Sequence, residues 1–252
     1  MGILNATPDS FSDGGRLAAA DSPDLLLQIR RMLDDGADIL DIGGESTRPG
    51  HVAVPAEEEL RRVLPVIRRI REEFGESVIS IDTRKAAVAK AALAAGADVV
   101  NDVSGFGDPG MAAVVRDAGC SVILMRNLPC RGDVVAAASD QLAELLAEAT
   151  EMYGLDAEQV ILDPGLGFGD PPGGDVEANF ALLRNVSSYG HGRPVLIGAS
   201  RKRFIGAWTG ESNPARRSAG SVAAARLAVE SGAAIVRVHD VAETVAALKW
   251  MK

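Results

Sequence analysis

Short apolar runs alternate with longer amphipathic segments along the whole chain. The short runs are rich in Val, Ile and Leu, and they lie at residues 3–7, 38–44, 78–83, 98–105, 121–126, 160–165, 194–200 and 234–240. They are apolar nearly throughout, which is typical of parallel strands that are covered on both faces. The segments between them are rich in Ala, Leu, Glu and Arg with helical spacing, as at 55–74, 86–95, 136–153 and 241–250. The pattern therefore predicts eight strands, each followed by helical structure.

Four of the expected helix-to-strand joints have the same composition. They read "DDGADIL", "AAGADVV", "DAGCSVI" and "ESGAAIV", with the glycines at 36, 96, 119 and 232. A glycine at such a place is the left-handed residue that ends a helix. Strands that alternate with helices pair in parallel through right-handed crossovers. We therefore expect a single-domain (β/α)8 TIM barrel over residues 1–252. The alternative, an open doubly wound sheet, is not supported by a GxGxxG or P-loop pattern.

Composition narrows the class of protein further. The 252 residues are 47% hydrophobic and 24% charged, which is typical of a globular chain. The net charge of −9 argues against a general nucleic-acid binder. No apolar stretch reaches the ~18–20 residues of a membrane span, and no secretory leader precedes the first strand. Cys120 and Cys130 form no metal-binding pattern, so we expect reduced thiols and a cytoplasmic protein.

Each expected strand ends in polar or sulfur-containing residues. In chain order these are Asn5, Asp41 with Glu45–Arg48, Asp82, Asn101 with Asp102, Met125 with Arg126, Asp163, Ser200–Lys202, and Arg237 with His239 and Asp240. One terminal Asp is explained by a helix cap or a turn. In a barrel, however, all eight ends meet at one mouth, where the active sites of this fold lie. The set as a whole therefore predicts one functional site.

Acceptors and cations come from different strands of this set. Asp82, Asn101 and Asp163 follow strands three, four and six, and a buried carboxylate needs donors. The edge of an aminopyrimidine, with a ring N–H beside an amino group, would supply two. Met125 could pack its thioether on such a flat ring.

The cations follow the last two strands. Arg201, Lys202, Arg237 and His239 lie where barrels often bind phosphate. An arginine offers two parallel donors to phosphate oxygens and a lysine a compact charge. The sequence thus predicts a flat heterocycle beside an anionic group.

Five motifs resemble the dihydropteroate synthase family across essentially the whole chain. They are "GILNATPDSFSDGG", "DIGGESTRPG", "DPGLGFG", "GASRKRFIG" and "RVHD", in this order. The resemblance implies condensation of 6-hydroxymethyl-7,8-dihydropterin pyrophosphate with p-aminobenzoate, giving 7,8-dihydropteroate and pyrophosphate. It also implies a requirement for Mg2+ and a homodimer formed through the last two helices, with small molecules as the substrates and neither nucleic acid nor membrane as a partner.

The family's functional positions carry over onto matching residues. The resemblance implies that Asp82, Asn101, Asp163 and Lys202 hold the pterin, that Met125 packs on its ring, and that Asn5 is associated with the metal. It implies that Thr47, Arg237 and His239 surround the pyrophosphate. Catalytic roles fall to Asp82, Lys202, Arg237 and His239. The remaining substrate-binding matches are Arg48, Phe168, Gly198 and Ser200.

The chain departs from the family pattern after strand six. The run "GFGDPPGGDVEANF" has Asp170 where the family usually has Lys, and we expect Asp170 to point away from the arylamine. Two alternatives to a synthase remain. A pterin-domain methyltransferase would not need "TPDSFSDGG" and "STRPG", and a non-catalytic pterin-binding protein would not need to retain Arg48, Lys202, Arg237 and His239.

Overall fold

A computed structural model describes residues 1–6, 23–45, 53–126, 132–168 and 175–251. Six strands form one parallel sheet in chain order: β1 (Gly2–Asn5), β2 (Ile39–Gly43), β3 (Val78–Asp82), β4 (Val99–Asp102), β5 (Ser121–Met125) and β6 (Val160–Asp163). β7 (Leu196–Ile197) and β8 (Ile235–Val236) pair in parallel with each other. Parallel bridges between Leu162 and Val195, and between Gly2 and Val238, join this pair to β6 and β1. The ring of strands is thereby closed.

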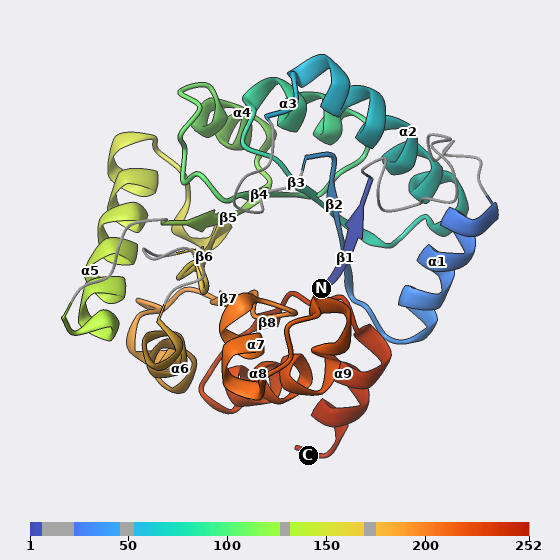
Figure 1. The fold of residues 1–252 in the computed structure, drawn as a ribbon. Helices are drawn as coiled ribbons and strands as arrows, with labels where there is room; N and C mark the ends of the chain where they lie inside the picture. Colours follow the sequence, from blue (N-terminus) through green and yellow to red (C-terminus); the bar gives the residue numbers. More distant parts are fainter. Residues whose placement is uncertain (7–22, 46–52, 127–131, 169–174, 252) are drawn as a thin grey trace.

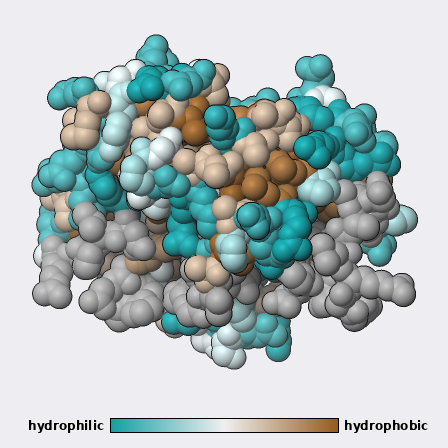
Figure 2. Space-filling model, turned by 90° about the horizontal axis from the view of Figure 1, so that it is seen from above, coloured by the Kyte–Doolittle hydropathy of each residue, from teal (hydrophilic) through white to brown (hydrophobic). Residues whose placement is uncertain are grey.

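Helices surround this ring, as Figure 1 shows. They are α1 (Pro23–Asp34), α2 (Ala56–Phe74), α3 (Ala86–Ala94), α4 (Met111–Ala118), α5 (Val134–Ala147), α6 (Val176–Arg184), α7 (Arg203–Thr209), α8 (Ser218–Glu230) and α9 (Val241–Lys249). The fold is a (β/α)8 TIM barrel, as the alternating pattern predicts. Figure 2 looks onto the side formed by α2, α3 and α4, where hydrophilic residues surround a smaller apolar area. Within the described ranges, no helix has both the length and the apolarity needed to cross a bilayer.

The glycine joints are confirmed. Gly36, Gly96, Gly119 and Gly232 have φ values of 97°, 112°, 64° and 107°, a region that favours glycine. The last two strands are shorter than the sequence predicts. β7 and β8 pair over only two residues each. The residues after them turn into the mouth. The helical segment expected at 136–153 continues past α5 as a π-helix, Glu148–Met152.

Strand alternation sorts the buried residues into two groups. Residues such as Leu40, Ile42 and Ile81 are fully buried in the large cluster that packs sheet against helices. Their neighbours on each strand point into the barrel, because successive side chains alternate. Val99, Ile123 and Leu196 form a small apolar cluster there, with Met1 and, at its edge, Ile39, Ile161 and Ile235. On β4 and β6, and just after β8, the next inward positions toward the carboxyl ends are Asn101, Asp163 and Arg237, and these polar residues build the site.

Candidate active site

A cavity of about 380 Å3 lies at the carboxyl ends of the strands. Ten of the residues predicted for the site line it: Asn5, Asp82, Asn101, Asp163, Phe168, Gly198, Ser200, Lys202, Arg237 and His239. They come from β1, β3, β4 and β6 and from the residues that follow β6, β7 and β8. The closed barrel thus brings together side chains that are far apart in the sequence.

The acceptor side of the cavity is deeply buried. Asp82, Asn101 and Asp163 are each at most 9% exposed. Asp82 Oδ1 is buried and, among the described residues, has no hydrogen-bond partner. Burial raises the pKa of Asp82, against the opposing effect of Arg237 and together with the nearby charge of Asp41. A buried acceptor without a donor is costly, so the site is built to receive a donor from a ligand.

Arg237 crosses from β8 to this acceptor side. Its Nε lies 2.5 Å from Asp41 Oδ2, and its Nη2 lies 2.6 Å from Asp82 Oδ2. The sequence argument assigned Arg237 to a separate cationic half of the site with His239. In the structure Arg237 also reaches the acceptor side, because a buried guanidinium needs carboxylate partners and the closed barrel places two of them opposite β8.

Lys202 and Asp163 form a second charged pair of the cavity. Burial raises the pKa of Asp163, while Lys202 and the Gly165 N–H, 2.8 Å from Oδ1, oppose that shift. Burial lowers the pKa of Lys202 to about 8, with Asp163 opposing. The Lys202 ammonium donates to the Leu166 carbonyl and lies 4.4 Å from the centre of the Phe168 ring. Lys202 is therefore positioned by β6 and the residues after it.

A strained turn delivers Ser200 and Lys202 into the cavity. Arg201, between them, has φ +59°, which is uncommon outside glycine. Its N–H donates to Ser221 Oγ at 2.9 Å, and its guanidinium forms a two-point pair with Asp240 at 2.5 and 3.2 Å. The sequence analysis placed Arg201 among the cations available to an anionic group of the substrate. Instead it serves to hold the turn.

Arg217 braces the same turn from the start of α8. Its guanidinium donates to the carbonyl oxygens of Arg201 (3.1 Å), Lys202 (3.3 Å), Glu211 (2.9 Å) and Ser212 (2.6 Å). Gly206 permits this, because a Cβ there would lie 2.5 Å from Arg217 Cζ. Beside the turn, Ser200 Oγ lies 3.0 Å from His239 Nδ1.

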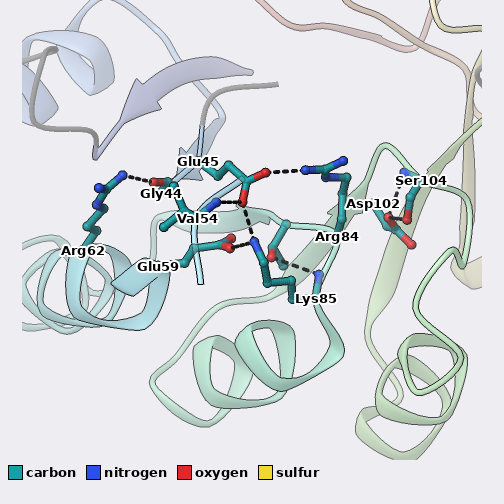
Figure 3. A network of polar contacts seen from close by, with 10 residues as sticks. Gly44, Glu45, Val54, Glu59, Arg62, Arg84, Lys85, Asp102 and Ser104 are labelled. Carbon is teal, nitrogen blue, oxygen red and sulfur yellow. Dashed lines mark hydrogen bonds and ion pairs between the residues drawn. The ribbon is translucent and has the colours of Figure 1, made fainter. Parts of the chain in front are cut away.

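Glu45 lies at the opposite rim, in the network of Figure 3. Its carboxylate accepts from Lys85 at 2.5 Å, from the Val54 N–H at 3.1 Å and from Arg84. Lys85 also contacts Glu59 of α2 at 2.5 Å. Burial by itself would raise the pKa of Glu45, but the donors outweigh it and lower that pKa to about 2. The network links the end of β2 to α2 and to the residues after β3.

Among the predicted site residues that the structure describes, Met125 does not line the cavity. Met125 is 1% exposed at the end of β5 and is not among the described lining residues. Its side chain packs under Gly165 instead. Thr47 and Arg48, like Asp170, lie outside the described residues.

The sequence analysis counted Asp41 and Glu45 among the strand-end residues but gave them no individual role, and it did not name Arg217. Glu45 and Arg217 line the cavity, and Asp41 lies below it with no exposed surface. Asp41 and Glu45 lie within "DIGGESTRPG", which was a usable signal. Arg217 follows the short 3-10 helix Pro214–Arg216, and no motif in the sequence marked it.

The described residues contain no cluster of three His, Cys, Asp or Glu side chains that could hold a metal by themselves. Asn5 nevertheless brings a carboxamide to the cavity from β1. Mg2+ usually takes one or two protein oxygens together with substrate phosphates and water. The donors present fit that mode of binding and do not form an all-protein cage.

Comparison with known proteins assigns the chain to a family. Residues 1–239 match the family described as pterin binding enzyme. The dihydropteroate synthase of Bacillus subtilis is 44% identical, over 100% of this chain and 86% of that protein. This chain belongs to the pterin-binding enzyme family.

Solved structures of pterin-binding enzymes agree with the assignment. The Xanthomonas albilineans dihydropteroate synthase with 4-aminobenzoic acid has a TM-score of 0.91 and is 46% identical, covering 100% of this chain and 91% of that one. The same enzyme in complex with 7,8-dihydropteroate has a TM-score of 0.88 at 45% identity, with the same coverage. The Escherichia coli dihydropteroate synthase is 40% identical over 99% of this chain and 89% of that protein.

Proposed function

We propose that this chain condenses 6-hydroxymethyl-7,8-dihydropterin pyrophosphate with p-aminobenzoate to give 7,8-dihydropteroate and pyrophosphate. Its relatives are dihydropteroate synthases over its full length. The observation that carries the proposal is the group of buried acceptors, Asp82, Asn101 and Asp163, on one side of the cavity. An aminopyrimidine ring presents donors that match them.

The pterin half of the reaction depends on binding and orientation. Asp82 and Asp163 accept hydrogen bonds from the ring, and Asn101 presents its amide oxygen to it. The Lys202 ammonium lies near Asp163 and over the Phe168 ring. From there, in this proposal, it contacts both the pterin ring and the p-aminobenzoate. His239 and Ser200, which line the cavity, bind the pyrophosphate in this proposal, while Gly198 leaves room for the substrate. The roles of Thr47 and Arg48 rest on the resemblance alone.

The chemical step breaks one C–O bond and forms one C–N bond. Pyrophosphate leaves with the electron pair of the C–O bond, and the methylene carbon of the pterin becomes cation-like. The p-aminobenzoate nitrogen attacks that carbon and then loses a proton to solvent. Such a step needs charge stabilisation more than a strong base, and the carboxylates Asp82 and Asp163 supply negative charge beside the ring.

Mg2+ is part of the proposal. Asn5 would hold it together with the pyrophosphate oxygens, and the ion would neutralise charge on the leaving group. We expect activity to disappear with a chelator and to return when Mg2+ is added. Activity that persists at full rate in the chelator would contradict the metal assignment.

We also propose a homodimer formed through α8 and α9. Exposed alanines of α8 (Ala219 and Ala223) and of α9 (Ala242 and Ala246) support it, as does the neighbouring Trp208, which is 59% exposed. Light scattering at micromolar concentration should give twice the chain mass of 26.2 kDa. A mass of one chain would contradict this proposal.

The decisive experiment combines the purified chain with both substrates and Mg2+ and follows pyrophosphate release and dihydropteroate formation. Omission of p-aminobenzoate is the control. Pterin binding without product in the complete mixture would favour the non-catalytic alternative. Methyl transfer from methyltetrahydrofolate would favour the methyltransferase.

A further inference from the structure

Asp41 lies beneath the cavity and is fully buried. Among the described carboxylates inside the barrel, it alone does not line the cavity. It lies in the middle of β2, has no exposed surface, and points into the barrel one layer below the ligand-facing residues. Nothing in the proposed reaction requires it to touch a substrate. Its hydrogen bonds, however, join it to two residues of the site, Asn101 and Arg237, and to Ser80 below them.

Three donors converge on the Asp41 carboxylate. Ser80 Oγ lies 2.6 Å from Oδ1, Arg237 Nε lies 2.5 Å from Oδ2, and Asn101 Nδ2 lies 3.4 and 3.3 Å from the two oxygens. An ionised carboxylate only accepts hydrogen bonds. The Asn101 group that faces Asp41 must therefore be its NH2 and not its oxygen.

This constraint decides what Asn101 offers to a ligand. A carboxamide has a donor end and an acceptor end, and a half-turn of the amide exchanges them with little change of shape. With the NH2 bonded to Asp41, the oxygen is left to the cavity that Asn101 lines. The described residues donate no hydrogen bond to that oxygen, and it is not among the side-chain atoms buried without a partner, so it is open to the cavity.

We infer that Asp41 is a positioning residue that fixes the amide of Asn101 with its oxygen toward the ligand, and thereby sets the site's preference for a donor-bearing heterocycle edge. The inference deepens the proposed function and rests on it. Without Asp41 the same Asn101 would accept either ligand edge after a half-turn. With it, the acceptors at 82, 101 and 163 present one consistent pattern.

The Asp41→Asn variant tests this because it keeps the volume but adds a donor. The charged Arg237 holds the oxygen of the new amide at the Oδ2 position, so the new NH2 takes the place of Oδ1, where it faces both Ser80 Oγ and the Asn101 amide and favours the half-turn of Asn101. The probes are pterin, with a 2-amino group, and lumazine, which has the same ring with a 2-oxo group. We expect the pterin-to-lumazine affinity ratio, measured by calorimetry, to fall about tenfold or more, as for an acceptor replaced by a donor.

The matched control is Ser80→Ala. It removes one hydrogen bond from Asp41 but leaves Asn101 held in place, so the affinity ratio should stay at the wild-type value. A merely structural role of Asp41 would weaken both ligands equally in Asp41→Asn and leave the ratio unchanged, which would overturn the inference. Failure of the wild-type protein to bind pterin would instead overturn the proposed function.

A measurement on the wild-type protein decides the matter even if Asp41→Asn does not fold. The side-chain NH2 of Asn101, assigned in the NMR spectrum by its loss in Asn101→Ser, should exchange slowly with deuterated water, since it is buried against Asp41. Rapid exchange would place the NH2 toward the open cavity and overturn the inference.

Discussion

At the scale of single residues, the site depends on groups whose charge is costly where they lie. Asp82, Asp163 and Lys202 all lose hydration at the cavity. Burial raises the pKa of the two carboxyl groups and lowers the pKa of Lys202, so it favours the neutral form of each. Arg237 keeps its charge because Asp41 and Asp82 both contact it. A ligand that supplies donors and negative charge relieves these costs, so binding energy is concentrated on a few side chains.

Asp163→Asn should weaken pterin binding while leaving the fold intact. The change removes one charged acceptor of the cavity and keeps its shape, and the Gly165 N–H can still bond to the amide oxygen. We expect a loss of about 1.5–3 kcal/mol in pterin affinity, measured by calorimetry, with an unchanged circular dichroism spectrum. An affinity equal to that of the wild type would show that Asp163 does not receive the ring.

Lys202 should give the reaction an alkaline limit. Its pKa is lowered to about 8 from 10.5, so the free enzyme loses this cation as the pH rises through 8. We expect kcat/KM for the pterin substrate to fall above about pH 8. In Lys202→Arg the guanidinium stays charged, so activity should be lower but level across pH 7.5–9.5. If the same decline persists in Lys202→Arg, another group sets the limit.

At the scale of elements, two devices connect the barrel to the mouth. One is the turn between β7 and α7, where Arg201 adopts a left-handed backbone and Arg217 binds four carbonyl groups. The other is the network of Glu45, Lys85 and Glu59, which ties β2 to α2 (Figure 3). Both hold irregular backbone that the strands alone do not fix.

Arg217→Ala should lower catalysis through the placement of Lys202. The loss of four donors frees the turn, and a displacement of this kind costs about 100-fold in kcat/KM. The neighbouring Arg216→Ala is the control, since that side chain is 76% exposed and pairs only with Glu211 among the described residues. We expect Arg217→Ala to stay folded under the assay conditions, which a melting temperature well above the assay temperature would show. If kcat/KM falls only in proportion to the unfolded fraction, Arg217 serves stability alone.

At the scale of the whole molecule, closure of the barrel makes one site from eight strand ends. The short pair β7–β8 joins the six-stranded sheet through single bridges on either side, and Figure 1 shows the complete ring. An apolar layer that includes Val99, Ile123 and Leu196 fills the barrel below the polar residues. The site therefore has a dry floor, which strengthens the electrostatic interactions above it.

Stability should depend on Glu45 in a defined range of pH. Its pKa is about 2 in the folded protein against 4.5 ordinarily, so its ionised form stabilises the fold above pH 4.5, and this contribution is lost as the pH falls through 2. Glu45→Gln should lower the free energy of unfolding at pH 7 by about 1–3 kcal/mol. Urea denaturation measures this, and the difference from the wild type should shrink toward pH 2.

Glu72→Gln is the control for Glu45. The Glu72 side chain is 65% exposed and pairs with Arg69 at 3.3 Å, so its loss should change stability by no more than about 0.5 kcal/mol. Equal effects of the two substitutions would show that the Glu45 network adds nothing beyond a surface ion pair.

The local pattern was sufficient for the fold and for most of the cavity lining. Strand and helix order follow from apolar runs and glycine stops, which depend only on neighbours in the chain, and parallel pairing then brings the strand ends to one mouth. For this reason Asp82, Asn101, Asp163 and Lys202 could be placed in one site without coordinates. The acceptor group is thus a property of the sequence itself.

The pairing of charges across the barrel was decided only by the tertiary structure. Arg237 and Asp41 are separated by 196 positions, and their contact depends on the stagger of strands and on which layer each side chain enters. No local preference encodes that geometry, so the sequence did not predict the pairing of Arg237 with Asp41, gave Asp41 and Glu45 no individual role, and did not single out Arg217. The sequence determined which polar groups reach the mouth, whereas packing determined which of them neutralise one another, because a buried charge must take whatever partner the closed barrel places within reach.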